Sequence, residues 1–198
     1  LPDNGETIVH EKRMVILTDV DCDIEPLKHF TKLEVDDYCN TSCLQTLLSE
    51  LKFLDHLEYR YKNKKGATLD NVRLSNENVR CITLSGFQSR NLMLEMVNLE
   101  EITMETLSLH DSPAIFQGCP NLKYMNATQT HMEGLIDWGC AISCAKDLVS
   151  INIADNCTVH ASKFTLKKLE SFSLRNNTMR NKSMVLDAPA LGVASIES

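Results

Sequence analysis

The sequence has no apolar run of the roughly 20 residues that a membrane-spanning helix requires, and residues 14–17 are among its longest. It also has little positive charge, because 20 lysine and arginine residues stand against 27 aspartate and glutamate residues, for a net charge of −7. Non-specific binding to nucleic acid or to anionic lipid needs a basic surface. We therefore expect no nucleic-acid partner and no direct insertion into a membrane.

Catalytic motifs are missing as well. The chain has no G-x-S-x-G nucleophile turn, no H-E-x-x-H metal motif, no phosphate-binding glycine loop and no dinucleotide fingerprint. Only seven glycines are available for cradling loops, and the six histidines are scattered along the chain. We predict that the protein is not an enzyme and takes no cofactor.

The eight cysteines are too few for a scaffold built on disulfides alone, but they are many for a cytosolic protein. Two pairs share one spacing, Cys39/Cys43 and Cys140/Cys144. No regular zinc-finger pattern emerges, although Cys157 lies near the second pair. We expect no metal and a set of disulfides, with Cys22 bonded to Cys39 or Cys43. The candidate disulfide cysteines are Cys22, Cys39, Cys43, Cys140, Cys144 and Cys157.

Acceptor sequences for N-glycosylation are more frequent than chance predicts. Five sequons begin at Asn40, Asn126, Asn156, Asn176 and Asn181, whereas the asparagine, serine and threonine content gives about two by chance. Together with the cysteines, this excess favours a secreted protein or the extracellular side of the cell surface. We expect glycans at Asn40, Asn176 and Asn181, which fall in connecting segments, with Asn126 as a further candidate.

A repeat runs through most of the chain. Its pattern is an apolar residue, two variable residues, an apolar residue, one variable residue and an apolar residue, followed in the fullest copies by asparagine at the ninth position. The full copies are Leu148/Ile151/Ile153/Asn156 and Leu169/Phe172/Leu174/Asn177. The looser copies are Phe30/Leu33/Val35, Leu54/Leu57/Tyr59, Val79/Ile82/Leu84, Leu99/Ile102/Met104, Leu122/Met125/Ala127 and Leu191/Ala194/Ile196.

The third apolar positions are separated by 24, 25, 20, 23, 26, 21 and 22 residues. All seven spacings lie in the 20–29 range of leucine-rich repeats. The centre of each copy predicts a short strand whose apolar side chains point into the core while their neighbours point outward. The ninth-position asparagine is expected to satisfy backbone groups of adjacent turns. Residues 42–51 predict a return helix with Ser42 as its N-cap.

In these residues the chain resembles the leucine-rich-repeat family, as an irregular extracellular member, from Phe30 to Ile196. The resemblance implies an α/β solenoid, a horseshoe of about eight repeats with short parallel strands on its concave face. Only Asn156 and Asn177 supply the family's asparagine. That departure leaves open the L-domains of insulin- and growth-factor-type receptors, which residues 156–159 resemble. Residues 118–122 resemble the cysteine-containing repeats of intracellular ubiquitin-ligase adaptors.

We divide the chain into an N-terminal capping segment, residues 1–29, and a repeat array, residues 30–198. Residues 14–17 are expected to form an edge strand of the cap. No matching cap follows the last copy, which predicts that the array is truncated at this end, continues in a longer chain or is covered by another chain. That end is also a candidate surface for a homo- or hetero-oligomer.

The expected function is recognition of an extracellular protein partner in adhesion, receptor signalling or innate immunity. Solenoids of this kind commonly bind through their concave surface. The first half of the predicted concave face is acidic and the second half is neutral with small side chains, so we expect a basic or polar partner surface. The candidate partner-binding residues are Glu34, Asp36, Glu58, Arg60, Glu101, Glu105 and Tyr124.

Overall fold

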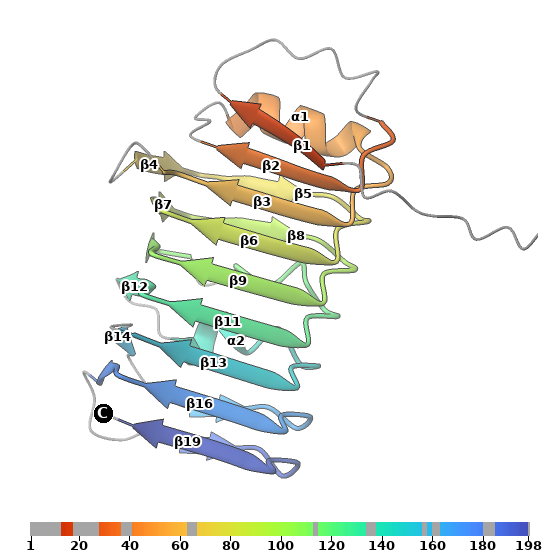
Figure 1. Ribbon diagram of the computed structural model, residues 1–198. Coiled ribbons are helices and arrows are strands. Elements are labelled where there is room, and N and C mark those ends of the chain that lie inside the picture. Colours follow the sequence, from red (N-terminus) through yellow and green to blue (C-terminus); the bar gives the residue numbers. More distant parts are fainter. Residues whose placement is uncertain are drawn as a thin grey trace, which may run out of the picture.

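The computed structural model of the chain describes residues 13–17, 28–36, 41–62, 67–112, 115–133, 138–155, 158–159, 163–179 and 185–197. The fold is a parallel β-solenoid, in which successive coils of the chain stack in one column (Figure 1). Its main sheet has nine strands. In order along the sheet they are β1 (Arg13–Leu17), β2 (Lys32–Asp36), β3 (His56–Arg60), β6 (Cys81–Ser85), β9 (Glu101–Glu105), β11 (Tyr124–Thr128), β13 (Ser150–Ala154), β16 (Ser171–Arg175) and β19 (Val193–Glu197).

The register of this sheet confirms the repeat. All its strand pairs are parallel, and the third apolar positions of neighbouring copies are direct partners, from Val35 opposite Tyr59 to Leu174 opposite Ile196. The expected edge strand is β1, which pairs with β2.

The sides of the coils are formed mainly by shorter strands. A second parallel sheet contains β4 (Ala67–Asp70), β7 (Phe87–Arg90), β10 (Ser108–His110), β12 (His131–Glu133), β14 (Thr158–Val159) and β17 (Thr178–Met179). Two further pairs join β5 (Arg73–Ser75) to β8 (Met93–Glu95) and β15 (Lys163–Thr165) to β18 (Val185–Asp187).

Helix is scarce in the described residues, contrary to the predicted α/β horseshoe. The two helices are α1 (Thr41–Glu50) and the single-turn α2 (Trp138–Ile142). The predicted return helix is confirmed as α1, although it begins at Thr41, so Ser42 lies in its first turn and is not its cap. Most other coils turn too often for a helix, since corners divide the return path into segments of two to four residues.

The corners explain this division. Backbone with positive φ follows the main-sheet strand at Gly86, Thr106, Gln129, Asp155 and Asn176. A second set, Asn71, Asn91 and Asp111, follows the strands of the second sheet. Glycine, asparagine and aspartate tolerate this left-handed conformation best, whereas β-branched Thr106 adopts it only at a cost.

The core lies between the main sheet and the short strands. In the six copies from Leu54 to Leu174, all three apolar positions are at most 2% exposed. In the last copy, Ile196 is 63% exposed, since β19 is the last strand of the main sheet in the described residues. Asn177 donates from Nδ2 to the Ile153 carbonyl at 2.6 Å, which confirms the expected role of the ninth position at this residue.

Candidate functional site

The outward side chains of the main sheet form the candidate site, which we call the outer face. The alternation of each strand produces it, because every second side chain of β3, β6, β9, β11 and β16 is buried and those between are at least partly exposed. The outer face consists of His56, Glu58, Arg60, Cys81, Thr83, Ser85, Glu101, Thr103, Glu105, Tyr124, Asn126, Thr128, Ser150, Asn152, Ser171, Ser173 and Arg175.

The charges of its first part are paired with one another. Glu58 lies 2.8 Å from Lys32 Nζ and 2.8 Å from Arg60 Nη2. Burial alone raises the pKa of Glu58, but the ammonium of Lys32 and the guanidinium of Arg60 outweigh it and hold the pKa below its ordinary value. Glu58 is therefore ionised and largely neutralised by its neighbours, which weakens any attraction for a basic partner here.

Two predicted contact residues are not available on the surface. Glu34 is 5% exposed and Asp36 is 8% exposed, whereas the alternation predicts both on the outer face. Asp36 accepts a hydrogen bond from Lys62 Nζ at 2.7 Å, and Glu34 lies 3.6 Å from Lys32 Nζ. The Asp36–Lys62 pair connects neighbouring coils, and the Glu34–Lys32 pair lies within β2, so we assign Glu34 and Asp36 to the structure of the solenoid.

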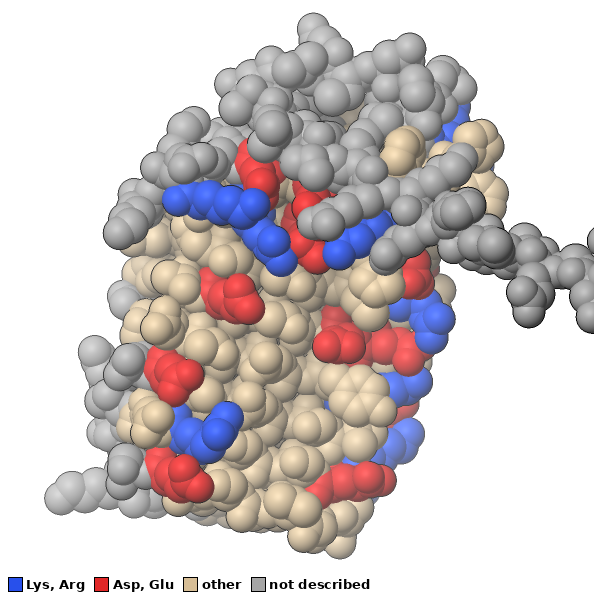
Figure 2. Space-filling model, in the orientation of Figure 1, with Lys and Arg blue, Asp and Glu red and all other residues tan. Residues whose placement is uncertain are grey.

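Beyond β3 the centre of the outer face is uncharged. Figure 2 shows charged side chains gathered over the first strands and along both margins of the face, with few at its centre. The central row is Thr83, Thr103, Asn126, Asn152 and Ser173, which are direct partners along the sheet. Asn152 donates to Asn126 Oδ1 at 2.8 Å. The row therefore presents short polar side chains on a regular backbone.

Three other predicted contact residues flank this row. Glu101 and Glu105 begin and end β9, and no described residue forms an ion pair with either. Tyr124 is opposite Glu101 in the register and is 46% exposed. An exposed aromatic ring beside short polar side chains is a typical anchor for a protein partner.

A cleft of about 630 Å³ opens at the corner where β3, β6, β9 and β11 end. We call it the corner cleft. Its lining residues are mainly uncharged, and they include the positive-φ residues Gly86, Thr106 and Gln129. Thr106 Oγ1 donates to Gln129 Oε1 at 3.3 Å. Buried Tyr61 and Phe87 contribute to it, with ring centroids 5.9 Å apart.

Sequence reasoning missed the corner cleft. The cleft depends on corners that lie 20 or more residues apart in the chain and are brought together by stacking. Thr106 shares its positive φ with the equivalent corners at Gln129, Asp155 and Asn176, so this conformation belongs to the coiling of the chain. The sequence offers no local signal for the corner cleft.

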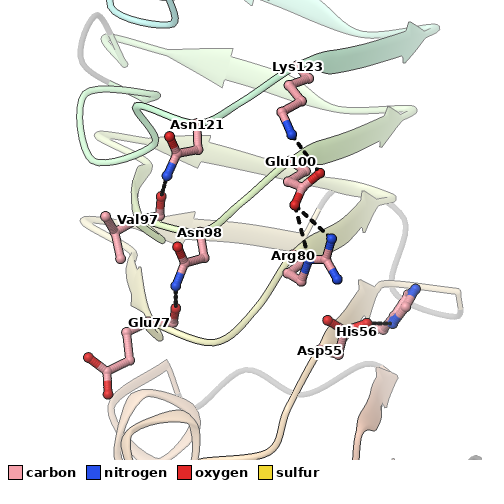
Figure 3. A network of polar contacts seen from close by, with 9 residues as sticks. All are labelled: Asp55, His56, Glu77, Arg80, Val97, Asn98, Glu100, Asn121 and Lys123. Atoms are coloured by element: carbon pink, nitrogen blue, oxygen red, sulfur yellow. Dashed lines mark hydrogen bonds and ion pairs between the residues drawn. The ribbon is translucent and has the colours of Figure 1, made fainter. Parts of the chain in front are cut away.

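Side-chain ladders on the other margin tie the coils together (Figure 3). Arg80 donates to Glu100 Oε1 from Nε at 3.1 Å and from Nη2 at 2.8 Å, and Lys123 Nζ donates to Glu100 Oε2 at 3.0 Å. The hydrogen bond from Arg80, followed by that from Lys123, lowers the pKa of Glu100. Asn98 and Asn121 donate to the backbone of the preceding coil at 2.7 and 2.8 Å.

The cysteines differ in environment. Cys119 is buried, and burial raises the pKa of its thiol to about 11. Cys81 lies on the outer face, and partial burial followed by the charges of Glu101 and Asp55 raises its thiol pKa. Cys140 and Cys144 are exposed, and Cys144 is a thiol, so the disulfide predicted at Cys144 is not formed in this structure. Cys22, Cys39, Cys157 and the side chain of Cys43 lie outside the described residues.

The sequons fall at different places. Asn126 is exposed at the centre of the outer face, where a glycan would obstruct the central row. Asn176 is exposed at a corner and donates to Asp155 Oδ1 at 3.2 Å. Asn40, Asn156 and Asn181 lie outside the described residues.

No group of three or more histidine, cysteine, aspartate or glutamate side chains among the described residues is placed to hold a metal ion. None of the helices seen there is long and apolar enough to cross a membrane.

The fold and the outer face define a parallel β-solenoid with a polar sheet surface. Comparison of the chain with models of protein families, with curated proteins and with solved structures gives no match.

Proposed function

We propose that this chain is an extracellular recognition module, an irregular relative of the leucine-rich-repeat solenoids, that binds a protein partner through the outer face. The observation that carries the proposal is the central row of short polar side chains, in register along the sheet, with exposed Tyr124 beside it. Main-chain pairing holds this row rigid, so a partner can bind without ordering loops.

The outer face is smaller than the surface that one partner contributes to a standard interface. Seven strands from β3 to β19, about 4.8 Å apart and five residues of about 3.3 Å long, give a face of about 30 by 17 Å, or roughly 500 Å². A standard interface takes about 800 Å² from each partner. The outer face is therefore sufficient only together with adjoining surface, and the corner cleft lies directly beside it.

The distribution of charge on the outer face indicates which charges the surface of a partner should carry. Because Lys32 and Arg60 neutralise Glu58, the remaining acidic contacts are Glu101 and Glu105 at the margins. A partner with basic groups spaced along the strand direction and a polar centre complements this arrangement.

A matched pair of substitutions tests the proposal. Thr103→Arg places a long cation in the central row, and Thr68→Arg places the same side chain on exposed β4, in the second sheet. Both variants and the parent chain are presented to an array of secreted and cell-surface proteins. We expect a partner that binds the parent chain and the Thr68→Arg control but loses affinity for Thr103→Arg by at least about tenfold.

A second pair tests the charges. Glu101→Lys with Glu105→Lys should slow association with that partner and reverse its salt dependence. Reversal of Glu58 is unsuitable, since it would place three cations together in a partly buried cluster. A partner that binds all these variants equally well contacts another surface, and the proposal then fails.

The extracellular location is part of the proposal and rests on the sequons and the cysteine count. A receptor L-domain shares that location, whereas an intracellular adaptor does not. Intact mass of the protein from its native source, before and after reduction and deglycosylation, separates these alternatives. No mass change on either treatment favours the adaptor.

A further inference from the structure

A second cleft, of about 600 Å³, lies between the segment that follows α2 and the neighbouring coil that contains β15. We call it the lysine cleft. It is lined by Ser143, Lys146, Asp147, Lys163, Thr165, Lys167 and Lys168. Four of these seven residues are lysines, in a chain whose net charge is −7.

The stacking of the coils brings the lysines together. The Leu148 amide donates to the Ala145 carbonyl, and the Leu169 amide donates to the Leu166 carbonyl, so the two turns are equivalent. Lys146 and Lys167 therefore occupy the same position on successive coils, which stack about 4.8 Å apart. Like charges at this separation repel, and their alignment destabilises the solenoid unless an opposite charge lies nearby.

The described acids offset only part of this charge. Asp147 lies 2.7 Å from Lys168 Nζ and is the single acidic residue of the lining. Lys146, Lys163 and Lys167 are exposed, and no described residue forms an ion pair with any of them. Asp187 lies opposite Thr165 in the register of β15 and β18, but it is not part of the lining.

We propose that the lysine cleft binds a small organic polyanion that carries sulfate or phosphate ester groups. The volume is in the range of cavities that hold small organic ligands. Lysine ammonium groups act as point charges, so they favour several anionic groups over one planar carboxylate. The Thr165 hydroxyl adds a polar group, whereas Ser143 already donates to the Cys140 carbonyl at 2.7 Å.

Two probes distinguish the source of the anionic group: sucrose octasulfate and inositol hexakisphosphate. The full chain is titrated with each at low salt by calorimetry. We expect binding of at least one probe that weakens as salt is added. Binding of only one probe shows which ester, sulfate or phosphate, the cleft prefers. Binding of both shows that the cleft recognises a high density of negative charge, whichever ester carries it.

Matched variants locate the site. Lys163→Ser with Lys167→Ser should raise the Kd about tenfold, since each exposed ion pair contributes up to about fivefold. Lys52→Ser with Arg90→Ser removes the same charge from exposed positions elsewhere, and Lys52 follows Leu51 as Lys146 follows Ala145. This control should retain the parent Kd.

One further variant is expected to lower the Kd instead of raising it. Asp147→Asn removes the acid of the cleft and releases Lys168, so it should tighten binding. Absence of binding by both probes at low salt, or an equal loss in the control and the cleft variants, would overturn the proposal.

Discussion

At the scale of single residues, the corners of the coils impose the strictest requirement, and Gly86 is the clearest case. Its φ is +81°, and a Cβ built on it would lie 2.2 Å from the Tyr61 carbonyl oxygen. Both backbone conformation and space therefore exclude any side chain here. Thr106, at the equivalent corner of the next coil, accepts the same conformation with a side chain, so the space left by the preceding coil decides the residue type.

Gly86→Ala is expected to lower the free energy of unfolding by at least about 2 kcal/mol, through left-handed backbone strain and overlap with Tyr61. Gly192→Ala is the control, because its Cβ would meet only the Glu170 carbonyl oxygen at 3.7 Å. Chemical denaturation of both variants checks the difference. Equal stability of the two would contradict the tight corner.

The thiols provide a second prediction at this scale. Alkylation of the folded, reduced protein at pH 8, followed by peptide mass mapping, should modify exposed Cys144 before Cys81 and leave Cys119 protected. Burial raises the pKa of both Cys81 and Cys119, and Cys119 also donates to the Leu94 carbonyl at 3.4 Å. In denaturant, the three cysteines should be alkylated at similar rates. Rapid labelling of Cys119 in the folded protein would show that this part of the core is open.

At the scale of elements, Asn76 fastens α1 to the following coil. Its Nδ2 donates to the Leu48 and Leu51 carbonyls at 2.6 and 3.1 Å, and its Oδ1 accepts from the Asn78 and Val79 amides at 2.8 and 3.1 Å. The side chain is 6% exposed, so water cannot easily replace these bonds. The side-chain amide of Asn76 thereby provides hydrogen-bond partners for backbone carbonyls at the end of α1 and for backbone amides at the start of the next coil.

Asn76→Ala should cost about 3 kcal/mol of stability, because buried carbonyl and amide groups lose their partners. Asn98→Ala removes a single exposed hydrogen bond to the Glu77 carbonyl and should cost no more than about 1 kcal/mol. Thermal and urea unfolding of the two variants provides the comparison. A smaller loss for Asn76→Ala than for Asn98→Ala would contradict its assigned role.

The Arg80–Glu100–Lys123 ladder gives a pH prediction. Since the folded-state pKa of Glu100 lies below its ordinary value of 4.5, its contribution to stability is present above that value and is lost as pH falls through the lowered pKa. Glu100→Gln should therefore lower the Tm at pH 7 and have little effect at pH 3. Glu170→Gln is the matched control, since its row neighbours are Val149 and Gly192. High salt should reduce the effect.

At the scale of the whole molecule, the repeat predicted the register of eight main-sheet strands because each position recurs in every coil. The same recurring pattern also predicted which side chains point outward, and these include Glu58, Arg60, Glu101, Glu105 and Tyr124. The pattern could not show that Lys32 and Arg60 neutralise Glu58, because that depends on which residue the next coil places opposite.

The rest of the fold escaped prediction for a related reason. Segments of two to four residues between corners are too short to show a periodicity, so the shorter strands of the sides carried no signal. The corner cleft and the lysine cleft arise from contacts between coils. Neither has a local sequence pattern.

Stacking in register has a consequence for the length of the protein. Each coil is a unit bounded by equivalent points, so the chain can be shortened by one whole unit without changing how the remaining units meet. Deleting residues 87–106 would join Gly86 to Leu107 and bring β6 beside β11, with the tight corner preserved.

This shortened protein should fold cooperatively and retain the circular dichroism of a parallel β-protein, whereas deletion of ten residues from the same coil should not. The deletion also places Arg80 next to Lys123, so adding Lys123→Glu should raise its Tm. We expect Lys123→Glu to raise the Tm of the shortened chain and to lower the Tm of the full-length chain. That result would show that the coils are interchangeable in shape, whereas their side-chain charges determine which coils stack favourably.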